Sequence, residues 1–409
     1  MTPPERQHAV WLGDERVGVL HQRGDHTRFA FASSYLANPE RPVLGLVFEQ
    51  DLSARHAATL RLPCWFSNLL PEGPLRDWIA SDRNVSPHRE MELLAQVGHD
   101  LPGAVRITEA AEGELEADWT EPPTSPPSEP PLDGRWRFSL AGVGLKFSML
   151  ATGDRLTLPA SGVGGDWIVK LPDQRFPDVP RNEFTMMSLA GMSGITVPEV
   201  RLVHRDELDG LPTDVWPGRE EWAYAVRRFD RTPERRSVHI EDLAQVRNVY
   251  PAQKYDGNFE TVAALVYRGQ DVAALHEFAR RIAFNVLISN GDAHLKNWSL
   301  IYTDPRVPTL APAYDLVSAR PYMGATEDLG LKMTGSRRFS DVRLRTFTRL
   351  EQRLAAEVGL AETADDTAAR TVEQWPRFAD LLAHNDALRA DIESSIMERS
   401  HLLRRRPTR

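Results

Sequence analysis

An amphipathic helix in the second half of the chain leads directly into a group of polar residues. Apolar side chains recur there at a 3.6-residue period, which predicts a helix with one buried face. The members of this stripe are Val272, Leu275, Phe278, Ala279, Ile282, Ala283, Val286 and Leu287. Just beyond it come Asp292 and, five residues later, Asn297; a second aspartate, Asp315, follows eighteen residues after Asn297. A carboxylate and an amide therefore stand at the end of a buried helix, with a second carboxylate close behind.

Phosphoryl transfer needs a set of this kind. One carboxylate orients the attacking hydroxyl, while an amide and a second carboxylate hold Mg²⁺ against the nucleotide phosphates. The Asp-x4-Asn spacing of Asp292 and Asn297 is that of a kinase catalytic loop, and Asp315 follows where a metal-binding aspartate is expected. The sequence thus predicts a kinase that uses ATP and Mg²⁺.

The composition divides the chain into modules. Residues 112–134 hold six prolines and seven acidic residues, so this segment reads as an extended linker or loop. It separates an N-terminal subdomain, 1–111, from a larger part, in which we expect a kinase N-lobe over 135–230 and an α-helical C-lobe over 231–409. At 409 residues the chain is long enough for this division.

Charge and cysteine content limit the partners and the compartment. A net charge of −9 gives no general affinity for nucleic acids or anionic membranes. The single cysteine, Cys64, excludes an intramolecular disulfide and a multi-cysteine zinc site, and is expected to be a packed thiol. We find no signal peptide and no apolar run long enough to span a membrane, so we expect a cytoplasmic protein without membrane contact.

The N-terminal subdomain is expected to be a small α+β unit without chemistry of its own. Strand-like segments at 10–12 and 16–20 flank a turn, and further strands are expected at 29–31 and 43–46. Helical patterns follow around 74–79 and 91–95.

The second part begins with strand-like segments around a glycine-rich turn. Backbone amides of such a turn can cradle phosphates. The residues of this turn assigned to nucleotide binding are Ser139, Ala141, Gly142, Val143, Gly144 and Lys146. Lys170 lies inside the apolar run 167–172, and a buried lysine needs a partner for its charge. Glu183, early in a predicted helix over 182–192, is the expected partner, and together they match the strand lysine and helix glutamate of kinases.

Other polar residues are assigned more general roles. His294 and Lys296 lie inside the catalytic loop. Lys296 could neutralise charge on a transferring phosphate, whereas His294 is expected mainly to shape the loop through hydrogen bonds. A strand-like segment over 221–229 ends in the run Arg228-Phe229-Asp230-Arg231, and we expect adenine near 225–228, between the lobes. The arginine cluster at 404–406 is read as a solvated chain end.

The chain resembles HipA-type toxin kinases, which are serine/threonine kinases of bacterial toxin–antitoxin modules. The loop from Asn285 to Asn297 carries the family signature, and the turn from Ser139 to Lys146 agrees as well. Further blocks that agree in order are 66–73, 97–104, 228–231, 241–243 and 312–315. The resemblance covers about residues 10–335.

The resemblance implies an α+β, bilobal protein-kinase-like fold, with a β-rich N-lobe, an all-α C-lobe and an added N-terminal subdomain. It implies that Asp292 is the catalytic aspartate, that Asn297 and Asp315 bind Mg²⁺, and that Lys170 contacts ATP phosphates. Ser139 would be the loop serine that such kinases phosphorylate in themselves. Gly144 departs from the family, which usually has glutamine there.

The family also implies partners. Its members pair with a small helix-turn-helix antitoxin that binds operator DNA, and some phosphorylate aminoacyl-tRNA synthetases. Two other functions stay open from the residues. The stretch from Gly291 to Asn297 also looks like the loop of aminoglycoside and choline kinases, which phosphorylate small molecules. The other open function is that of a corepressor, which would strengthen antitoxin binding to DNA and have only weak kinase activity.

Overall fold

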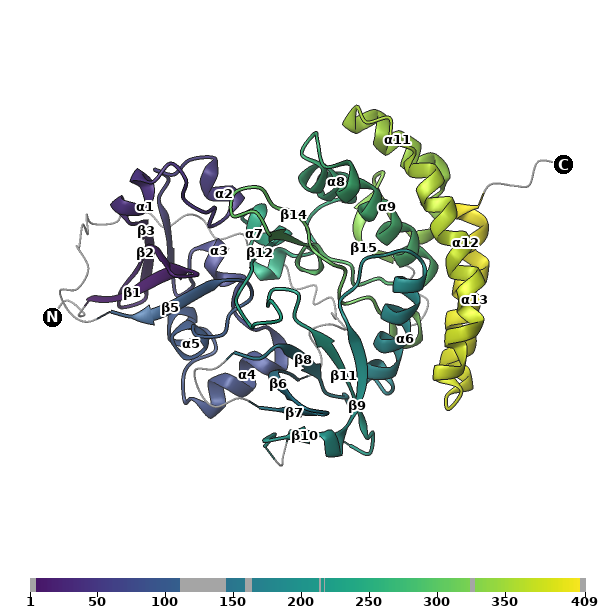
Figure 1. Ribbon diagram of the computed structural model, residues 1–409, viewed down its shortest axis with the longest axis horizontal. Helices are drawn as coiled ribbons and strands as arrows, with labels where there is room; N and C mark the ends of the chain where they lie inside the picture. Colours follow the sequence, from purple (N-terminus) through teal and green to yellow (C-terminus); the bar gives the residue numbers. More distant parts are fainter. Residues whose placement is uncertain are drawn as a thin grey trace.

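The computed structural model describes residues 5–110, 145–158, 164–212, 215–216, 218–323 and 328–404. Three units lie side by side in Figure 1: an N-terminal subdomain, a β-rich N-lobe and a mainly helical C-lobe whose last helices form one edge of the molecule. The α+β kinase-like architecture expected from the sequence is confirmed. No helix within the described ranges is long and apolar enough to cross a membrane.

The N-terminal subdomain is a five-stranded antiparallel sheet, ordered β4-β3-β2-β1-β5, with short helices on one side. Its core is aromatic and includes Phe29, Phe48, Trp65 and Phe66, all 3% exposed or less. The elements are β1 (Glu5–Leu12), β2 (Glu15–Arg23), β3 (His26–Phe31), α1 (Ser33–Ala37), α2 (Leu46–Glu49), β4 (His56–Thr59), α3 (Cys64–Ser67), α4 (Gly73–Asp82), α5 (Glu90–Val97) and β5 (Val105–Glu109).

The prediction of a strand at 43–46 is wrong. Helix α2 begins at Leu46 instead, because backbone groups of this segment contact the C-lobe and not a neighbouring strand. The amide of Val43 donates to Pro305 O at 2.9 Å, and the amide of Leu46 donates to Glu241 Oε1 at 3.0 Å. These contacts fix the subdomain against the C-lobe.

The N-lobe is a six-stranded sheet, ordered β10-β7-β6-β8-β11-β9, with α6 packed on β9 and β11. Side chains alternate across β8, so Trp167 and Val169 are buried in the lobe while Lys170 projects from the other face. The elements are β6 (Lys146–Thr152), β7 (Arg155–Thr157), β8 (Trp167–Lys170), α6 (Val179–Met192), β9 (Val200–His204), η2 (Arg205–Glu207), β10 (Leu208–Asp209) and β11 (Trp222–Arg227).

The C-lobe is built around α9, the helix predicted from the apolar stripe. Twelve of its sixteen residues are buried, and α8, α12 and α13 pack against it. The helical elements are α7 (Leu243–Val246), η3 (Pro251–Gln253), α8 (Phe259–Tyr267), α9 (Val272–Leu287), η4 (Leu295–Asn297), α10 (Arg320–Met323), η5 (Phe339–Asp341), α11 (Leu344–Leu354), α12 (Leu360–Ala379), η6 (Asp380–Leu382) and α13 (Asp386–Leu403).

The expectation of an all-α C-lobe needs correction, since this lobe also carries two small sheets. One has three strands in the order β12-β13-β14 and the other is a hairpin. The strands are β12 (His239–Asp242), β13 (Ser299–Tyr302), β14 (Thr309–Leu310), β15 (Asp328–Met333) and β16 (Ser336–Arg338). Strand β13 starts two residues after Asn297, so the small sheet anchors the far end of the catalytic loop.

Candidate active site

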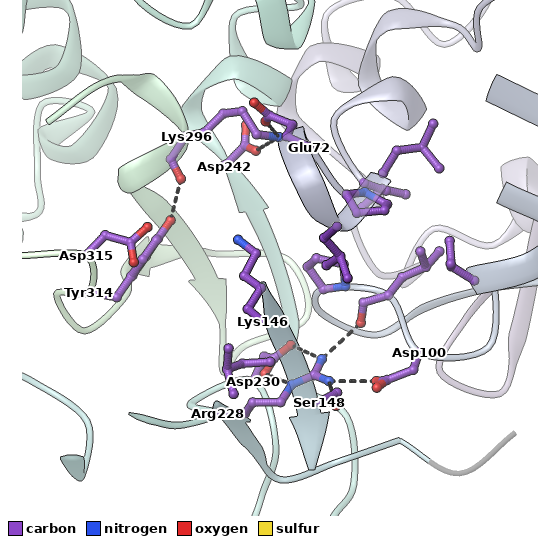
Figure 2. Close-up of a pocket in the computed structure, with 18 of the residues that line it drawn as sticks. Glu72, Asp100, Lys146, Ser148, Arg228, Asp230, Asp242, Lys296, Tyr314 and Asp315 are labelled. Carbon is purple, nitrogen blue, oxygen red and sulfur yellow. Dashed lines mark hydrogen bonds and ion pairs between the residues drawn. The ribbon is translucent and has the colours of Figure 1, made fainter. Parts of the chain in front are cut away.

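A cavity of about 590 Å³ lies where the three units meet. It is bounded by β6 and β8 of the N-lobe, by the segment around η4 of the C-lobe and by residues 68–79 of the N-terminal subdomain. Figure 2 shows acidic and basic side chains from all three units around this space. The volume falls in the range of small-molecule binding sites.

Lys170 is the centre of the polar end of the cavity. Its Nζ lies 2.6 Å from Glu183 Oε1 and also bonds Asp315 Oδ1, so the strand lysine joins a glutamate of α6 to the aspartate after the catalytic loop. Burial tends to lower the pKa of Lys170, but the negative charges of Asp315 and Glu183 outweigh the effect of burial and raise that pKa. Burial raises the pKa of Glu183, whereas Lys170 keeps that of Asp315 low despite burial. The expected partnership of Lys170 and Glu183 is confirmed.

The catalytic loop follows a left-handed turn at Ser289 (φ 57°) just after α9. The amide of Asp292 donates to Asn290 Oδ1 at 3.1 Å, and Asn297 Nδ2 donates to Asp292 O at 2.9 Å, so both sides of Asp292 are held. Its carboxylate is 2% exposed and accepts a hydrogen bond from the hydroxyl of Tyr255. Asn297 lines the cavity, whereas Asp292 is not among the lining residues.

His294 lines the same cavity and is 3% exposed. Burial lowers its pKa to about 4, so the imidazole is neutral at neutral pH. Neither ring nitrogen has a hydrogen-bond partner within the described part of the chain, so the hydrogen bonds expected to shape the loop are not made by this side chain. A buried polar group left unpaired in this way is costly and commonly marks a place where a ligand or water binds.

Lys296 turns toward the N-terminal subdomain. Its Nζ lies 3.0 Å from Asp242 Oδ2, 3.4 Å from Glu72 Oε1 and 2.7 Å from Asn68 O. Glu72 also pairs with Lys254 at 2.8 Å. Burial opposes ionisation of Glu72, but Lys296 and Lys254 lower its pKa to about 2. This group of Glu72, Asp242, Lys254 and Lys296 is called the loop network below.

Lys146 extends into the middle of the space in Figure 2, between the loop network and Asp315. Its backbone lies opposite that of Lys170 where strand β6 pairs with strand β8. Within the described residues its ammonium makes no hydrogen bond or ion pair. Burial lowers the pKa of Lys146, although Asp315 opposes the shift. Two neighbouring cations, one of them uncommitted, form an environment suited to a polyanion such as a nucleotide triphosphate.

The donor set can be tested against a metal ion. No three His, Cys, Asp or Glu groups of the described ranges are placed to hold one. Mg²⁺ is usually held by one or two carboxylates together with substrate phosphates. Asp315 and Asn297 line the same cavity and offer one carboxylate and one amide, which fit that requirement and fit a Zn²⁺ site poorly.

Arg228 lines the cavity, but its guanidinium is committed to protein groups. It donates to both carboxylate oxygens of Asp230, to Asp100 Oδ1 at 2.6 Å and to Leu101 O at 3.0 Å. Arg231 donates to Asp100 and Asp230 as well. These four side chains, called the hinge network below, join the segment after β11 to the N-terminal subdomain. Three of them, Asp100, Arg228 and Asp230, are labelled in Figure 2. Residues 226–229 line the cavity and overlap the expected adenine position at 225–228.

The N-terminal subdomain forms a wall of the cavity, and the expectation that it has no chemistry of its own stays a prediction. Leu75 and Trp78 of α4 line the space, and Trp78 packs edge-on against Phe147 of the N-lobe with ring centroids 5.6 Å apart. Glu72 stands beside Lys296. No local sequence pattern identifies Glu72, because its partners Lys254 and Lys296 lie more than 180 residues away in the chain. The segment that contains it, 66–73, was singled out only because it agrees with the family resemblance.

The glycine-rich turn lies outside the described residues. Ser139, Ala141, Gly142, Val143 and Gly144 therefore remain sequence predictions, and only Lys146, at the start of β6, is placed. The thiol of Cys64 is half-buried beside the loop network, and burial raises its pKa to about 12, in keeping with a packed, unreactive cysteine.

Comparison with known proteins agrees with this geometry. Residues 138–375 match the model of the HipA-like C-terminal domain, and residues 8–108 match that of the HipA N-terminal domain. The chain is 42% identical over 376 residues to Y4dM of Sinorhizobium fredii, which is named as a kinase; the match covers 90% of this chain and 89% of that protein. It is 29% identical to the serine/threonine-protein kinase toxin HipA of Shewanella oneidensis, over 78% and 77% of the two chains.

A solved structure shares the fold. It is the complex of HipA, HipB and operator DNA from the toxin–antitoxin system of Shewanella oneidensis, with a TM-score of 0.74, 22% sequence identity and 96% coverage of both chains. The two family models together span both the subdomain that walls the cavity and the lobes that carry its charged residues. The chain belongs to the HipA family of kinases.

Proposed function

We propose that this protein is an ATP- and Mg²⁺-dependent serine/threonine protein kinase that acts as the toxin of a toxin–antitoxin module. The observation that carries the proposal is the contact of Lys170 with both Glu183 and Asp315 at a cavity that Asn297 also lines. A strand lysine joined to a helix glutamate, with a loop asparagine and a following aspartate, is the constellation used for phosphoryl transfer.

Each residue has a role in this proposal. Lys170, held by Glu183, binds the α/β-phosphates, and Lys146 adds a second positive charge beside it. Asp292 orients the acceptor hydroxyl and receives its proton. Asn297 and Asp315 would hold Mg²⁺, which offsets charge on the transferring phosphoryl group.

Three groups contribute less directly. The neutral imidazole of His294 has no hydrogen-bond partner among the residues that the structure describes, so it can donate to a phosphate oxygen or an ordered water. Lys296 keeps the loop seated against the N-terminal subdomain, and Arg228 fixes the segment that would contact adenine. The proposed division of labour follows the expected domains, with nucleotide contacts from 135–230 and catalytic residues from 231–409.

Regulation and partners follow from the family. We propose Ser139 as an autophosphorylation site: a phosphate there adds about −1.5 to −2 charges to a loop meant to hold other phosphates and so weakens ATP binding. The relative from Shewanella oneidensis is named a toxin and is found with HipB on operator DNA. A small HipB-like antitoxin, operator DNA through that complex, and a translation protein such as an aminoacyl-tRNA synthetase are the partners proposed here.

The test is phosphopeptide mass spectrometry after incubation with Mg-ATP, on the parent and on Asp292→Ala. We expect one phosphate on Ser139 in the parent and a rate at least about 10²-fold lower in Asp292→Ala, the loss typical of a missing general base. Asp391→Ala, which removes an exposed carboxylate of α13, is the control and should behave as the parent. Parent-like phosphorylation of Asp292→Ala would refute the assignment. ATP consumed only with amino-alcohol acceptors would favour a small-molecule kinase.

A further inference from the structure

Tyr255 lies directly behind the catalytic loop. Its ring packs edge-on against His294, with centroids 5.1 Å apart, and its hydroxyl donates to Asp292 Oδ1. Its backbone carbonyl accepts a hydrogen bond from the Arg337 guanidinium at 2.8 Å, which holds the backbone of Tyr255 in place. The backbone carbonyl of the preceding residue, Lys254, accepts a hydrogen bond from the amide of Leu295 at 3.0 Å. The segment after η3 therefore holds the loop at a backbone group and at the carboxylate of Asp292.

We propose that Tyr255 is a positioning residue for Asp292, an inference that rests on the proposed phosphotransfer function. Asn290 and Asn297 hold the backbone of Asp292, but a fixed backbone does not fix the rotation of a carboxylate. The phenol hydroxyl engages Oδ1 and thereby restricts the rotation of the carboxylate that would receive the acceptor proton. Since hydrogen bonds to charged groups are the stronger kind, this contact can select one rotamer.

Tyrosine suits this task. A phenol is neutral over the working pH range and donates one hydrogen bond, so it orients the carboxylate without neutralising it as a cation would. Its ring has only two side-chain torsions, and packing against His294 removes freedom from both. Tyr255 is not among the residues that line the cavity, which argues for a supporting position behind Asp292 and against Tyr255 acting as an acceptor itself.

The experiment uses Tyr255→Phe, which keeps the ring and removes only the hydroxyl. The rate of phosphotransfer at saturating Mg-ATP should fall about 10–100-fold, the equivalent of one hydrogen bond to a charged group. Affinity for Mg-ATP, measured by calorimetry, should stay within about two-fold because the nucleotide contacts are untouched. Tyr250→Phe is the matched control: its hydroxyl donates to Leu62 O at 3.3 Å, away from the catalytic loop, and it should keep the parental rate.

Three results would overturn the inference. They are an unchanged rate in Tyr255→Phe, an equal loss of rate and of nucleotide affinity, and a phosphate found on Tyr255 itself. Combining the substitution with Asp292→Ala sharpens the test, since a residue that acts through Asp292 should cause no further loss of rate once Asp292 is gone.

A second measurement separates this inference from the proposed function. Urea unfolding of the parent, Tyr255→Phe, Asp292→Ala and the double variant gives the coupling of the two side chains without any activity assay. A non-additive cycle is expected, and an additive one would overturn the inference even if the kinase is active. A parent that transfers phosphate to no acceptor would refute the proposed function, while the unfolding cycle would still decide whether Tyr255 holds Asp292.

Discussion

Two charged networks join the N-terminal subdomain to the kinase lobes, and they are built differently. The hinge network uses two arginines, Arg228 and Arg231, whose side chains are 7% and 8% exposed and which also donate to backbone carbonyls. The loop network uses two lysines, and its carboxylate Glu72 is 26% exposed. Both contain two cations and two carboxylates, so charge balance alone does not distinguish them.

The difference lies in geometry and in neighbours. Arginine donates through a rigid planar fork and is always charged, whereas lysine is a flexible point charge. The hinge network therefore fixes one arrangement of the segment after β11. The loop network includes one residue of the catalytic loop itself, Lys296, which is two residues from His294 and adjacent to Asn297. We infer that the first network mainly stabilises the fold, whereas the second mainly sets the geometry of the loop.

The largest expected loss of stability comes from Arg228→Leu. It leaves Asp230 and Asp100 buried with less compensating charge, and breaking a buried ion pair on one side costs about 3–5 kcal/mol. Urea unfolding should show this loss. Arg227→Leu is the control, because Arg227 is 42% exposed and its contact with Glu199 is a surface pair, worth about 1 kcal/mol or less. Equal losses in both variants would contradict the structural role of the hinge network.

A smaller effect, and one that depends on pH, is expected at Glu241, a third contact between the same units. Its carboxylate is fully buried and accepts from Leu46, Trp65 and Tyr302. Burial raises its pKa to about 7 from a usual value of 4.5. The folded state then binds this proton more tightly than the unfolded state, so Glu241 makes stability fall as pH rises from about 4.5 to about 7.

Glu241→Gln carries no titrating proton and should remove that part of the slope. At pH 5 it should also cost about 1–3 kcal/mol, because the amide nitrogen leaves one buried donor unpaired. Unfolding free energies of parent and variant, measured from pH 5 to 8, check both expectations. Parallel pH profiles would show that Glu241 is not the titrating group.

The smallest loss of stability is expected from Glu72→Gln, at about 1 kcal/mol, because Lys296 keeps its contact with Asp242. Its effect on phosphotransfer should be larger than its effect on folding, since a displaced catalytic loop can cost up to about 10²-fold in rate. Initial rates at saturating Mg-ATP measure it. Glu92→Gln, which removes a partly exposed carboxylate paired with Arg89, serves as control. An unchanged rate in Glu72→Gln would remove the distinction between the networks.

The sequence predicted the parts of the site that local pattern can encode. The helix before Asp292 was visible from its period, and Lys170 and Glu183 were visible as a charged strand residue followed by a helix carboxylate. Their contact is confirmed, and the structure also brings Lys170 into contact with Asp315, which the sequence analysis did not predict. The roles of Asp292 and Asn297 stay predictions.

Long-range and short-strand features were missed for a physical reason. The ion pair of Glu72 with Lys254 spans 182 positions and leaves no periodic trace in either segment. Strand β13 is buried at all four residues, so it lacks the alternation by which a half-exposed strand is recognised. Strand β12 does alternate, but over only four residues, and the side chains that it buries are the polar His239 and Glu241. Segment 43–46 looked like a strand because it is apolar, yet its amides contact the C-lobe.

The wall that α4 adds to the cavity has a consequence for inhibitor selectivity. A compound that occupies the phosphate end alone would contact Lys146, Lys170 and Asp315, groups whose chemistry is general to nucleotide sites. A compound that extends to Leu75 and Trp78 would gain apolar contact from a unit outside the two kinase lobes. Its discrimination between this protein and two-lobed kinases would then come from the N-terminal subdomain.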